Sequence, residues 1–420
     1  MDENEDKQIL SEESLSTNAK IKVIGVGGGG SNAVNQMIKN KSDEVDYWVL
    51  NTDCQALSNS PCENKYVLGK TTTKGLGAGG NPLRGKEAAN ESYSDLQLLV
   101  KGSDLVFIAA GEGGGTGTGA APIIAKAAKE EGCLVLAIVT RPFNFEGKAR
   151  RLNALEGINE LKKNVDALIV VSNDKLIFNN GSMPLKNAFS SSDEVLAQSV
   201  KTITDLILVH GLINLDFADV KATLQDKGIS LIGIGMGEGK DAAMKAAQSA
   251  INSQLLEASI KGAKSMIINV TIGSSTTLDE IQYAINYVTE AANGNDNDVN
   301  IIFGVQIDDT FSDKVKFAII ATDFSKEIDF SVSEPLINKV HHQSGDETLK
   351  PEASLAEKEI QSQKNSSPLP DYLREIYSNG NDDNASEEKP DLSTPLDDTK
   401  TNDGDKTDST KPISRDYEIN

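Results

Sequence analysis

Glycine is concentrated in two stretches that each follow an apolar run and precede a segment with helical spacing. The first glycine segment, Gly25–Gly30, reads GVGGGG and satisfies the GxGxxG pattern. The second glycine segment, Gly111–Gly119, reads GEGGGTGTG and carries the hydroxyls of Thr116 and Thr118 between its glycines. Glycine lets the backbone approach a phosphate closely, and a helix N-terminus offers unpaired N–H groups to an anion. Both segments therefore predict phosphate binding.

These segments leave the identity of the ligand open. The first, with Asp53 lying 23 residues after Gly30, is compatible with a dinucleotide site that uses an acid for the ribose, or with tight strand–helix packing and no ligand. The second contains no lysine, so it is not the GxxxxGK[ST] loop. A third glycine segment, Gly75–Pro82, reads GLGAGGNP. Three such segments on one sheet favour a nucleoside triphosphate over a dinucleotide.

Two acids, Asp216 and Asp219, lie three residues apart in the otherwise apolar stretch NLDFADV. At helical spacing they share one face of a helix. Two acids at the start of a helix are often a cap with a favourable dipole interaction. The functional alternative is that they polarise a water molecule that attacks a γ-phosphate, with or without a metal ion.

The elements that must position these residues alternate between short apolar runs and helical patterns. Continuous apolar runs of this kind are typical of parallel strands that are covered on both faces. The expected strands are 21–26, 46–51, 104–110, 133–139 and 167–171, with a helix over about 120–131. The first part of the chain is therefore expected to be a parallel-sheet, nucleotide-binding domain of an α/β protein.

A long helix over 184–209 follows, because its apolar residues recur close to a 3.6-residue period. Beyond Gly228 the pattern predicts strands at 229–234, 265–272, 300–305 and 316–321, with helices within 240–260 and 277–292. We therefore expect a first sheet domain, a long central helix and a smaller C-terminal α/β domain.

Composition limits the remaining possibilities. Asp plus Glu number 63 against 41 Lys plus Arg, a net charge of −22, which argues against a general nucleic-acid binder. No apolar run reaches the 18 residues of a membrane-spanning helix, and the N-terminus lacks signal-peptide character, so a cytoplasmic protein is expected. The three cysteines are expected to be reduced, and three histidines are too few for a His-rich zinc site or a His-dependent triad.

The two ends of the chain are polar and acidic. Segments so poor in apolar residues bury too little surface to offset their ordering entropy, so we expect them to be flexible. One island, Pro368–Tyr377, interrupts the C-terminal tail with apolar residues.

The motifs together identify a family. The second glycine segment contains GGGTGTG, the signature of the tubulin/FtsZ family of GTPases, and the chain resembles that family over residues 19–325. The other matching motifs are Gly25–Asn32, Asn51–Asp53, Gly77–Pro82, Thr140–Phe143 with Glu146 and Arg150, Asn173–Leu176, and Asn214–Asp219.

The resemblance implies a tubulin/FtsZ-like α/β fold with a disordered acidic tail. The expected organisation is a disordered extension at 1–18, a GTP-binding domain at 19–183, the central helix and catalytic loop at 184–227, a C-terminal α/β domain at 228–325, and a flexible linker and tail at 326–420.

The resemblance also implies a GTP site built from these motifs. Asn51, Thr140, Glu146 and Arg150 would line the ribose and phosphates, the carboxylate of Glu146 accepting from ribose hydroxyls. The residues that would hold the phosphates are Gly27, Gly28, Gly29, Gly30, Gly111, Gly113, Gly114, Gly115, Thr116, Gly117, Thr118 and Gly119. No dedicated protein site for a metal is expected, since Mg²⁺ would be held mainly by the phosphates; whether K⁺ is needed is left open.

The same resemblance assigns recognition of the base. Asn32, Asn173 and Asp193 would face guanine, and Phe189, one helical turn before Asp193, could stack on it. A carboxylate suits guanine because it accepts from both N1–H and the 2-amino group, which adenine does not offer. Core packing of Phe189 and a solvated helix face for Asp193 are the alternatives.

Assembly follows from the length of the central helix. About 26 residues span ~39 Å, so one chain can hardly bring both ends of the helix to the same phosphate. The family resemblance implies that Asp216, Asp219 and Asn214 complete the site of the next subunit in a head-to-tail filament, and that hydrolysis to GDP requires that contact. The filament would form the cytokinetic ring under the membrane at the midcell division site.

The family also carries an adaptor-binding peptide after a flexible linker. Leu369, Tyr372, Leu373 and Arg374 resemble its anchor residues and would bind membrane-tethering division adaptors such as FtsA or SepF, with negative regulators controlling ring placement. No direct insertion into a membrane is expected, because an acidic tail is repelled by anionic lipid.

Three other interpretations remain. A monomeric NAD-dependent oxidoreductase would rest on the first glycine segment and Asp53, and leaves the second glycine segment and Asn214–Asp219 without a role. A scaffold that binds nucleotide without turnover is disfavoured by the presence of both acids. A chromosome-segregating relative is a narrower alternative within the same family.

Overall fold

A computed structural model of the chain describes residues 19–177, 184–209, 211–292, 299–325 and 328. The expectations for the N-terminal extension and the adaptor-binding peptide fall outside these residues. Within them, no helix has the length and apolar character needed to cross a membrane.

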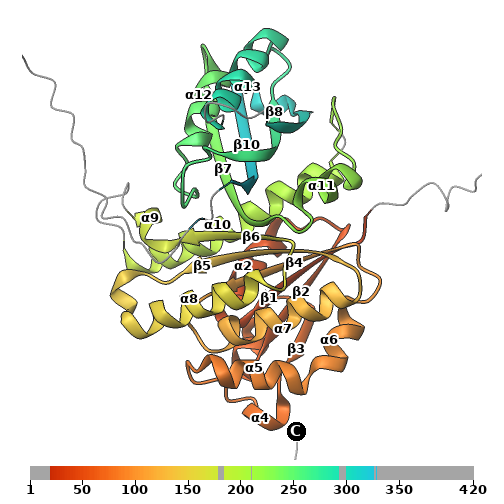
Figure 1. The fold of residues 1–420 in the computed structure, drawn as a ribbon, viewed down its shortest axis with the longest axis vertical. Helices are drawn as coiled ribbons and strands as arrows, with labels where there is room; N and C mark the ends of the chain where they lie inside the picture. Colours follow the sequence, from red (N-terminus) through yellow and green to blue (C-terminus); the bar gives the residue numbers. More distant parts are fainter. Residues whose placement is uncertain (1–18, 178–183, 210, 293–298, 326–327, 329–420) are drawn as a thin grey trace, which may run out of the picture. The chain divides into compact units, whose positions relative to one another are not determined.

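The first part of the chain builds a parallel sheet (Figure 1). Its strands lie in the order β3-β2-β1-β4-β5-β6-β7, and each neighbouring pair is parallel. Their bounds are β1 Ile21–Val26, β2 Val45–Asn51, β3 Asn64–Val67, β4 Leu105–Gly111, β5 Leu134–Arg141, β6 Ala167–Ser172 and β7 Gly228–Glu238. Because the strands are parallel, their carboxyl ends share one edge of the sheet.

Helices cover both faces of this sheet, as the continuous apolar runs predict. Successive residues of β4 alternate between two cores: Phe107 packs into one, and Val106 and Ile108 into the other. The first core includes side chains of α2 Gly27–Met37, α3 Cys54–Asn59, α9 Asn173–Ile177, α10 Leu185–Leu208 and α11 Phe217–Leu224. The second includes side chains of α5 Pro82–Glu91, α6 Tyr93–Val100, α7 Thr116–Glu130 and α8 Lys148–Lys162.

The second part of the chain continues the same sheet. β10, Lys314–Phe324, runs antiparallel to both β7 and β8, Ala263–Ile272, and β9, Asn300–Ile307, lies parallel to β8. A third core joins these strands to α12, Ala242–Ile251, and α13, Leu278–Ala292. The expected α/β fold class is confirmed, while the domain boundaries stay a prediction, because one ten-stranded sheet runs through both parts.

Glycine has a packing role in β7 that its pattern alone did not reveal. A Cβ atom on Gly233, Gly235 or Gly237 would lie 2.3, 2.2 or 2.0 Å from a carbonyl oxygen of α12. The carbonyls belong to Ala250, Ala246 and Ala242, which are spaced by four residues on one stripe of that helix. The alternating glycines therefore let the helix backbone lie directly on the strand.

Candidate functional site

The first two glycine segments meet at the carboxyl ends of the neighbouring strands β1 and β4. A Cβ atom on Gly27 would lie 2.8 Å from the amide nitrogen of Gly117, and one on Gly29 would lie 3.3 Å from the Cα of Gly111. The two segments are thus in backbone contact, at a distance that side chains would prevent.

Much of both segments is helical. α2 begins at Gly27 and α7 at Thr116, whereas the pattern placed the start of the second helix near Ala120. Packing explains the glycine within this helix, since a Cβ atom on Gly119 would lie 2.0 Å from the carbonyl oxygen of Pro82 in α5. Two helix N-termini, each with unpaired N–H groups in its first turn, therefore stand side by side at this edge.

Two glycines of the first two segments face open space instead. A Cβ atom on Gly28 or Gly114 would meet no atom within 4 Å. One lies in the first turn of α2 and the other just before α7, and neither has a positive φ. Packing does not require glycine at either position, and the open space beside them is where an anion bound to the two helix N-termini would lie.

The third glycine segment packs against the second. The amide of Gly77 donates to the Thr52 carbonyl at 3.0 Å, and a Cβ atom on Gly115 would lie 2.8 Å from Ala78 Cβ. The hydroxyls of Thr52 and Thr116 are 2.6 Å apart. All three glycine segments therefore surround one place.

Asn51 and Asp53 lie beside them at the end of β2. The Asn51 side chain is buried, and its Oδ1 accepts from the Asp53 amide at 3.2 Å. The Asp53 carboxylate caps α3, accepting from the amides of Gln55 and Ala56. This cap gives the acid after β2 a structural role, so its presence does not require that it bind the ribose of a dinucleotide.

The residues expected near the ribose come from the end of β5 and the start of α8. Thr140 is buried, and its carbonyl accepts from the Glu112 amide at 2.9 Å. Glu146 accepts from the Phe143 amide at 2.9 Å and forms an ion pair with Arg150. A Cβ atom on Gly113 would lie 2.7 Å from the Arg150 carbonyl oxygen, so this group adjoins the second glycine segment.

The residues expected at the base form a neighbouring group. The ring of Phe189, 42% exposed, lies edge-on to that of Phe143 at 5.1 Å, and Phe143 stacks on Phe145 at 5.0 Å. The Asn173 Oδ1 accepts from the Ser192 hydroxyl at 2.7 Å, which ties α9 to α10. Burial raises the pKa of the neighbouring Asp193 to about 6. The remaining expected residue, Asn32, is exposed on α2.

The three residues expected to be catalytic lie elsewhere. Asp216 caps α11, and its Oδ1 accepts from the Asp219 amide at 2.8 Å. The helix cap that the sequence suggested is therefore present within the chain. The Asn214 Oδ1 accepts from the Gly211 amide at 2.5 Å.

Main-chain hydrogen bonds join this loop to β9. The Leu212 amide donates to the Val305 carbonyl at 2.8 Å, and the Val305 amide donates to the Ile213 carbonyl at 3.1 Å. The loop that carries the acids is therefore held by the second part of the chain.

The topology separates the acids from the glycine segments. Asn173 follows β6 at the carboxyl edge of the sheet, and α10 must return the chain to the opposite edge, because β7 runs parallel to β6 and pairs Gly228 with Ala167. The 16 residues from Asp193 to Leu208 alone span about 22 Å, at a rise of about 1.5 Å for each of the 15 steps between them. One chain does not bring Asp216 and Asp219 to its own glycine segments.

Sequence analysis missed one residue of this region, Glu112. It lies between Gly111 and Gly113, and its side chain is buried without a hydrogen-bond partner among the described residues for either carboxyl oxygen. Burial raises its pKa to about 8, although the nearby Thr118 hydroxyl acts in the opposite direction and lowers it. The signal in the sequence that could have identified Glu112 was its position, an acid between an apolar strand and a glycine-rich segment.

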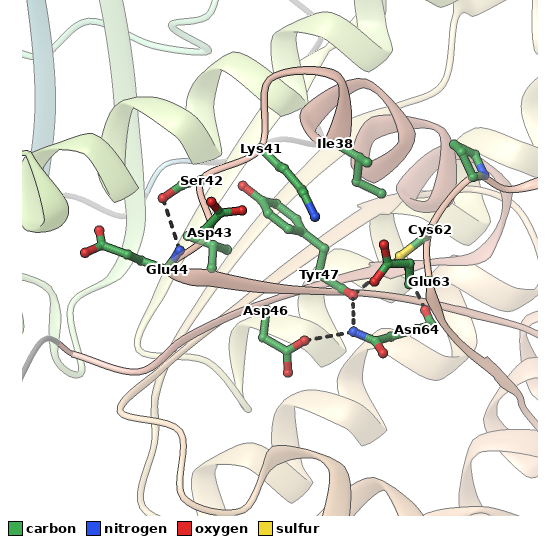
Figure 2. Close-up of a pocket in the computed structure, with 12 residues that line it drawn as sticks. Ile38, Lys41, Ser42, Asp43, Glu44, Asp46, Tyr47, Cys62, Glu63 and Asn64 are labelled. Carbon is green, nitrogen blue, oxygen red and sulfur yellow. Dashed lines mark hydrogen bonds between the residues drawn. The ribbon is translucent and has the colours of Figure 1, made fainter.

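A polar cavity lies at the other end of β2 (Figure 2). Asp46 and Asn64 line it, and Asn64 Nδ2 donates to Asp46 Oδ1 at 2.9 Å. It adjoins the amino end of the strand, away from the glycine segments. Among the residues that the structure describes, no group of three or more His, Cys, Asp or Glu side chains could hold a metal ion.

Comparison with known proteins finds two family models that match the chain. The family model described as the GTPase domain of the tubulin/FtsZ family matches residues 20–180, and that of the FtsZ family C-terminal domain matches residues 228–325. A solved structure titled as an empty FtsZ dimer from M. jannaschii is 41% identical, with a TM-score of 0.69, and the match covers 74% of this chain and 90% of that one.

A second structure, a point mutant of the same FtsZ, is 41% identical with a TM-score of 0.70, covering 74% of this chain and 93% of that one. CetZ2 from Haloferax volcanii, titled as a GTPγS-bound protofilament, shares the fold at 20% identity and a TM-score of 0.62, covering 72% of this chain and 92% of that one. The chain belongs to the tubulin/FtsZ family of GTPases, and within it to the FtsZ proteins. It is accordingly a GTPase that binds GTP and GDP.

Proposed function

We propose that this GTPase polymerises head to tail and hydrolyses GTP at the contact between two subunits. The observation that carries the proposal is the separation of Asp216 and Asp219 from the three glycine segments, which lie at the opposite edge of the sheet. Two copies stacked in the same orientation would bring one edge against the other. Such a contact is heterologous and does not close, so it produces filaments. The dimer title of the M. jannaschii relative is consistent with self-association.

In this arrangement the phosphates of GTP lie at the N-termini of α2 and α7, in the space beside Gly28 and Gly114. Arg150 is positioned for a phosphate, and Glu146 for the ribose hydroxyls. Asp193 accepts from the guanine N1–H and 2-amino group, with Asn32 and Asn173 beside it and Phe189 against the base. Mg²⁺, held mainly by the phosphates, would neutralise charge on them. Whether GTP hydrolysis also requires K⁺ is a separate question.

The catalytic loop of the next subunit supplies the acids. Asp216 and Asp219 orient and polarise the attacking water, and Asn214 shapes the loop through its bond to the Gly211 amide. The water attacks the γ-phosphorus, the bond to the β–γ bridging oxygen breaks, and GDP and inorganic phosphate result. Loss of the γ-phosphate would weaken the contact and let the filament turn over.

The proposed cellular role is supported by membership of the family. The filament would form the cytokinetic ring at the division site in the cytoplasm, tethered to the membrane by an adaptor that binds residues 368–377 and placed by negative regulators. The anchor residues Leu369, Tyr372, Leu373 and Arg374 suit a partner groove that is apolar with an acidic rim.

Two measurements test hydrolysis at the interface. Turnover of GTP per subunit should be near zero in dilute protein and rise above a threshold concentration; a rate that is independent of concentration would overturn the proposal. The second measurement mixes two inactive variants. Gly114→Ala closes the phosphate space but keeps the acids, whereas Asp216→Asn keeps the phosphate space and the cap of α11.

Each variant alone should be inactive, and an equal mixture should regain turnover. In random stacking, about one contact in four joins an intact nucleotide site to an intact acid pair. The matched control mixes Asp216→Asn with Asp219→Asn, in which no chain carries both acids, and should stay inactive. Equal activity in the two mixtures would contradict hydrolysis in trans.

A further inference from the structure

Glu112 is a buried acid that the proposed mechanism does not use. It directly follows β4, within the second glycine segment, and its side chain is only 5% exposed. Neither carboxyl oxygen has a hydrogen-bond partner among the described residues. A buried polar group without a partner is costly, and an unpaired buried charge is costlier, so its protonation state affects the structure around it.

Three elements pack around this carboxyl group. From α8, Gly157 comes so close that a Cβ atom on it would lie 2.3 Å from Glu112 Oε2 and 2.4 Å from Thr118 Cγ2. From α7, the hydroxyl of Thr118 is close enough to lower the pKa of Glu112. From β5, the Thr140 carbonyl accepts from the Glu112 amide. The side chain is therefore enclosed beneath the second glycine segment.

Thr118 connects Glu112 to the segment above it. Its hydroxyl oxygen accepts from the amide of Gly113 at 2.8 Å. Gly113 has a φ of +96°, and this bond across the segment holds that turn in place. A change in the hydrogen bonding of Thr118 therefore reaches the backbone of the second glycine segment directly.

No charged group compensates the carboxyl within the described part of the chain. The pKa of Glu112 is raised by burial to about 8 and lowered only by Thr118, with no contribution from a neighbouring charge. Arg150 of α8 pairs with Glu146, and Arg141 of β5 pairs with Glu257. The other charged residues of the three elements are Lys126, Lys129 and Glu130 on α7, and Lys148, Arg151, Glu156, Glu160 and Lys162 on α8.

We propose that Glu112 is a positioning residue of the nucleotide site: as a neutral acid it leaves the Thr118 hydroxyl to its bond with the Gly113 amide, which keeps the second glycine segment in the conformation that binds phosphates. Once ionised, the carboxylate lacks partners and competes for the Thr118 hydroxyl and for main-chain amides of the segment. Those amides are the donors that a phosphate needs. The added charge beneath the site also repels the phosphates of the ligand.

This inference rests on the proposed placement of the phosphates, and it predicts how affinity depends on pH. If binding requires the neutral acid and its pKa is about 8, the affinity for GDP falls about tenfold between pH 7 and pH 9. Glutamine has the same shape and does not ionise. The affinity of Glu112→Gln for GDP should therefore change less than about twofold between pH 7 and pH 9, after the effect of the ionisation of GDP itself is subtracted.

The experiment is calorimetric titration of the full chain with GDP, which avoids turnover, at pH 7, 8 and 9. The variants are wild type, Glu112→Gln, and Glu131→Gln as a matched control that removes an exposed acid at the far end of α7. Wild type and Glu131→Gln should lose affinity in parallel, and Glu112→Gln should not. Glu112→Met, uncharged and of similar length, should give the same flat profile and serves if the glutamine variant does not fold.

Each outcome decides a different point. Parallel profiles for wild type and both Glu112 variants would overturn the positioning role while leaving GTP binding intact. Failure of the wild type to bind GDP at pH 7 would instead overturn the proposed placement of the nucleotide.

Discussion

Replacing Glu112 by glutamine should change how the stability of the nucleotide-free protein depends on pH. In the folded chain, burial raises the pKa of this carboxyl from 4.5 to about 8. In the unfolded chain it ionises near 4.5, so between these two values the folded state holds a proton that the unfolded state has lost. The free energy of unfolding of the wild type therefore falls as pH rises through this window.

The size of the effect follows from the shift. One pKa unit corresponds to about 1.36 kcal/mol, which gives a loss on the order of 5 kcal/mol from below pH 4.5 to above pH 8. Between pH 6 and pH 8 alone the loss is about 2 kcal/mol. Buried glutamine has its own hydrogen-bonding cost, but that cost does not depend on pH.

The assay is urea denaturation of wild type, Glu112→Gln and Glu131→Gln at pH 6, 7 and 8 without nucleotide. The stability difference between Glu112→Gln and wild type should increase by about 2 kcal/mol in favour of the variant over this range. Glu131→Gln should follow the wild type. A difference that stays constant from pH 6 to pH 8 would show that the Glu112 carboxyl is solvated and ionises normally, which would refute the reasoning from burial.

Three further predictions concern the glycines and the base. Gly114→Ala should keep the wild-type urea midpoint while losing GTP binding, whereas Gly119→Ala, whose Cβ would meet a carbonyl at 2.0 Å, should cost about 1–3 kcal/mol of stability. Asp193→Asn should weaken the binding of guanine nucleotides by about 10- to 100-fold and favour the binding of xanthine nucleotides in competition assays. The GTP affinity of the wild type should also fall below pH 6, where Asp193 gains a proton. Gly235→Ala should lower the free energy of unfolding by about 1–3 kcal/mol, whereas Met236→Ala, at an exposed position of the same strand, should change it little in the same urea denaturation.

The local pattern was sufficient for most elements of the fold. Strands buried on both faces are continuous apolar runs, and β1, β4 and β6 lie within a residue or so of their expected bounds. The short strand β3 and the helices α5, α6 and α8 were not predicted, because their patterns are weaker and long-range packing decides them. The order of strands beyond β6 also depends on pairings distant in sequence.

The sequence by itself determined that the first two glycine segments lie at the edge of the sheet, because each directly follows a predicted strand. It also determined the cap at Asp216, since the bond to the Asp219 amide spans only three residues. Only the tertiary structure decided that Gly28 and Gly114 face open space while Gly119 is enclosed, because identical residues differ there solely in their neighbours.

The tertiary structure also decided the environment of Glu112 and the distance between the two halves of the proposed active site. Burial of a carboxyl depends on Gly157, 45 residues further along the chain. The separation of Asp193 from Asp216 depends on β7 running parallel to β6, which sends α10 across the full height of the sheet. Both are consequences of contacts between distant segments, which no local pattern of residues encodes.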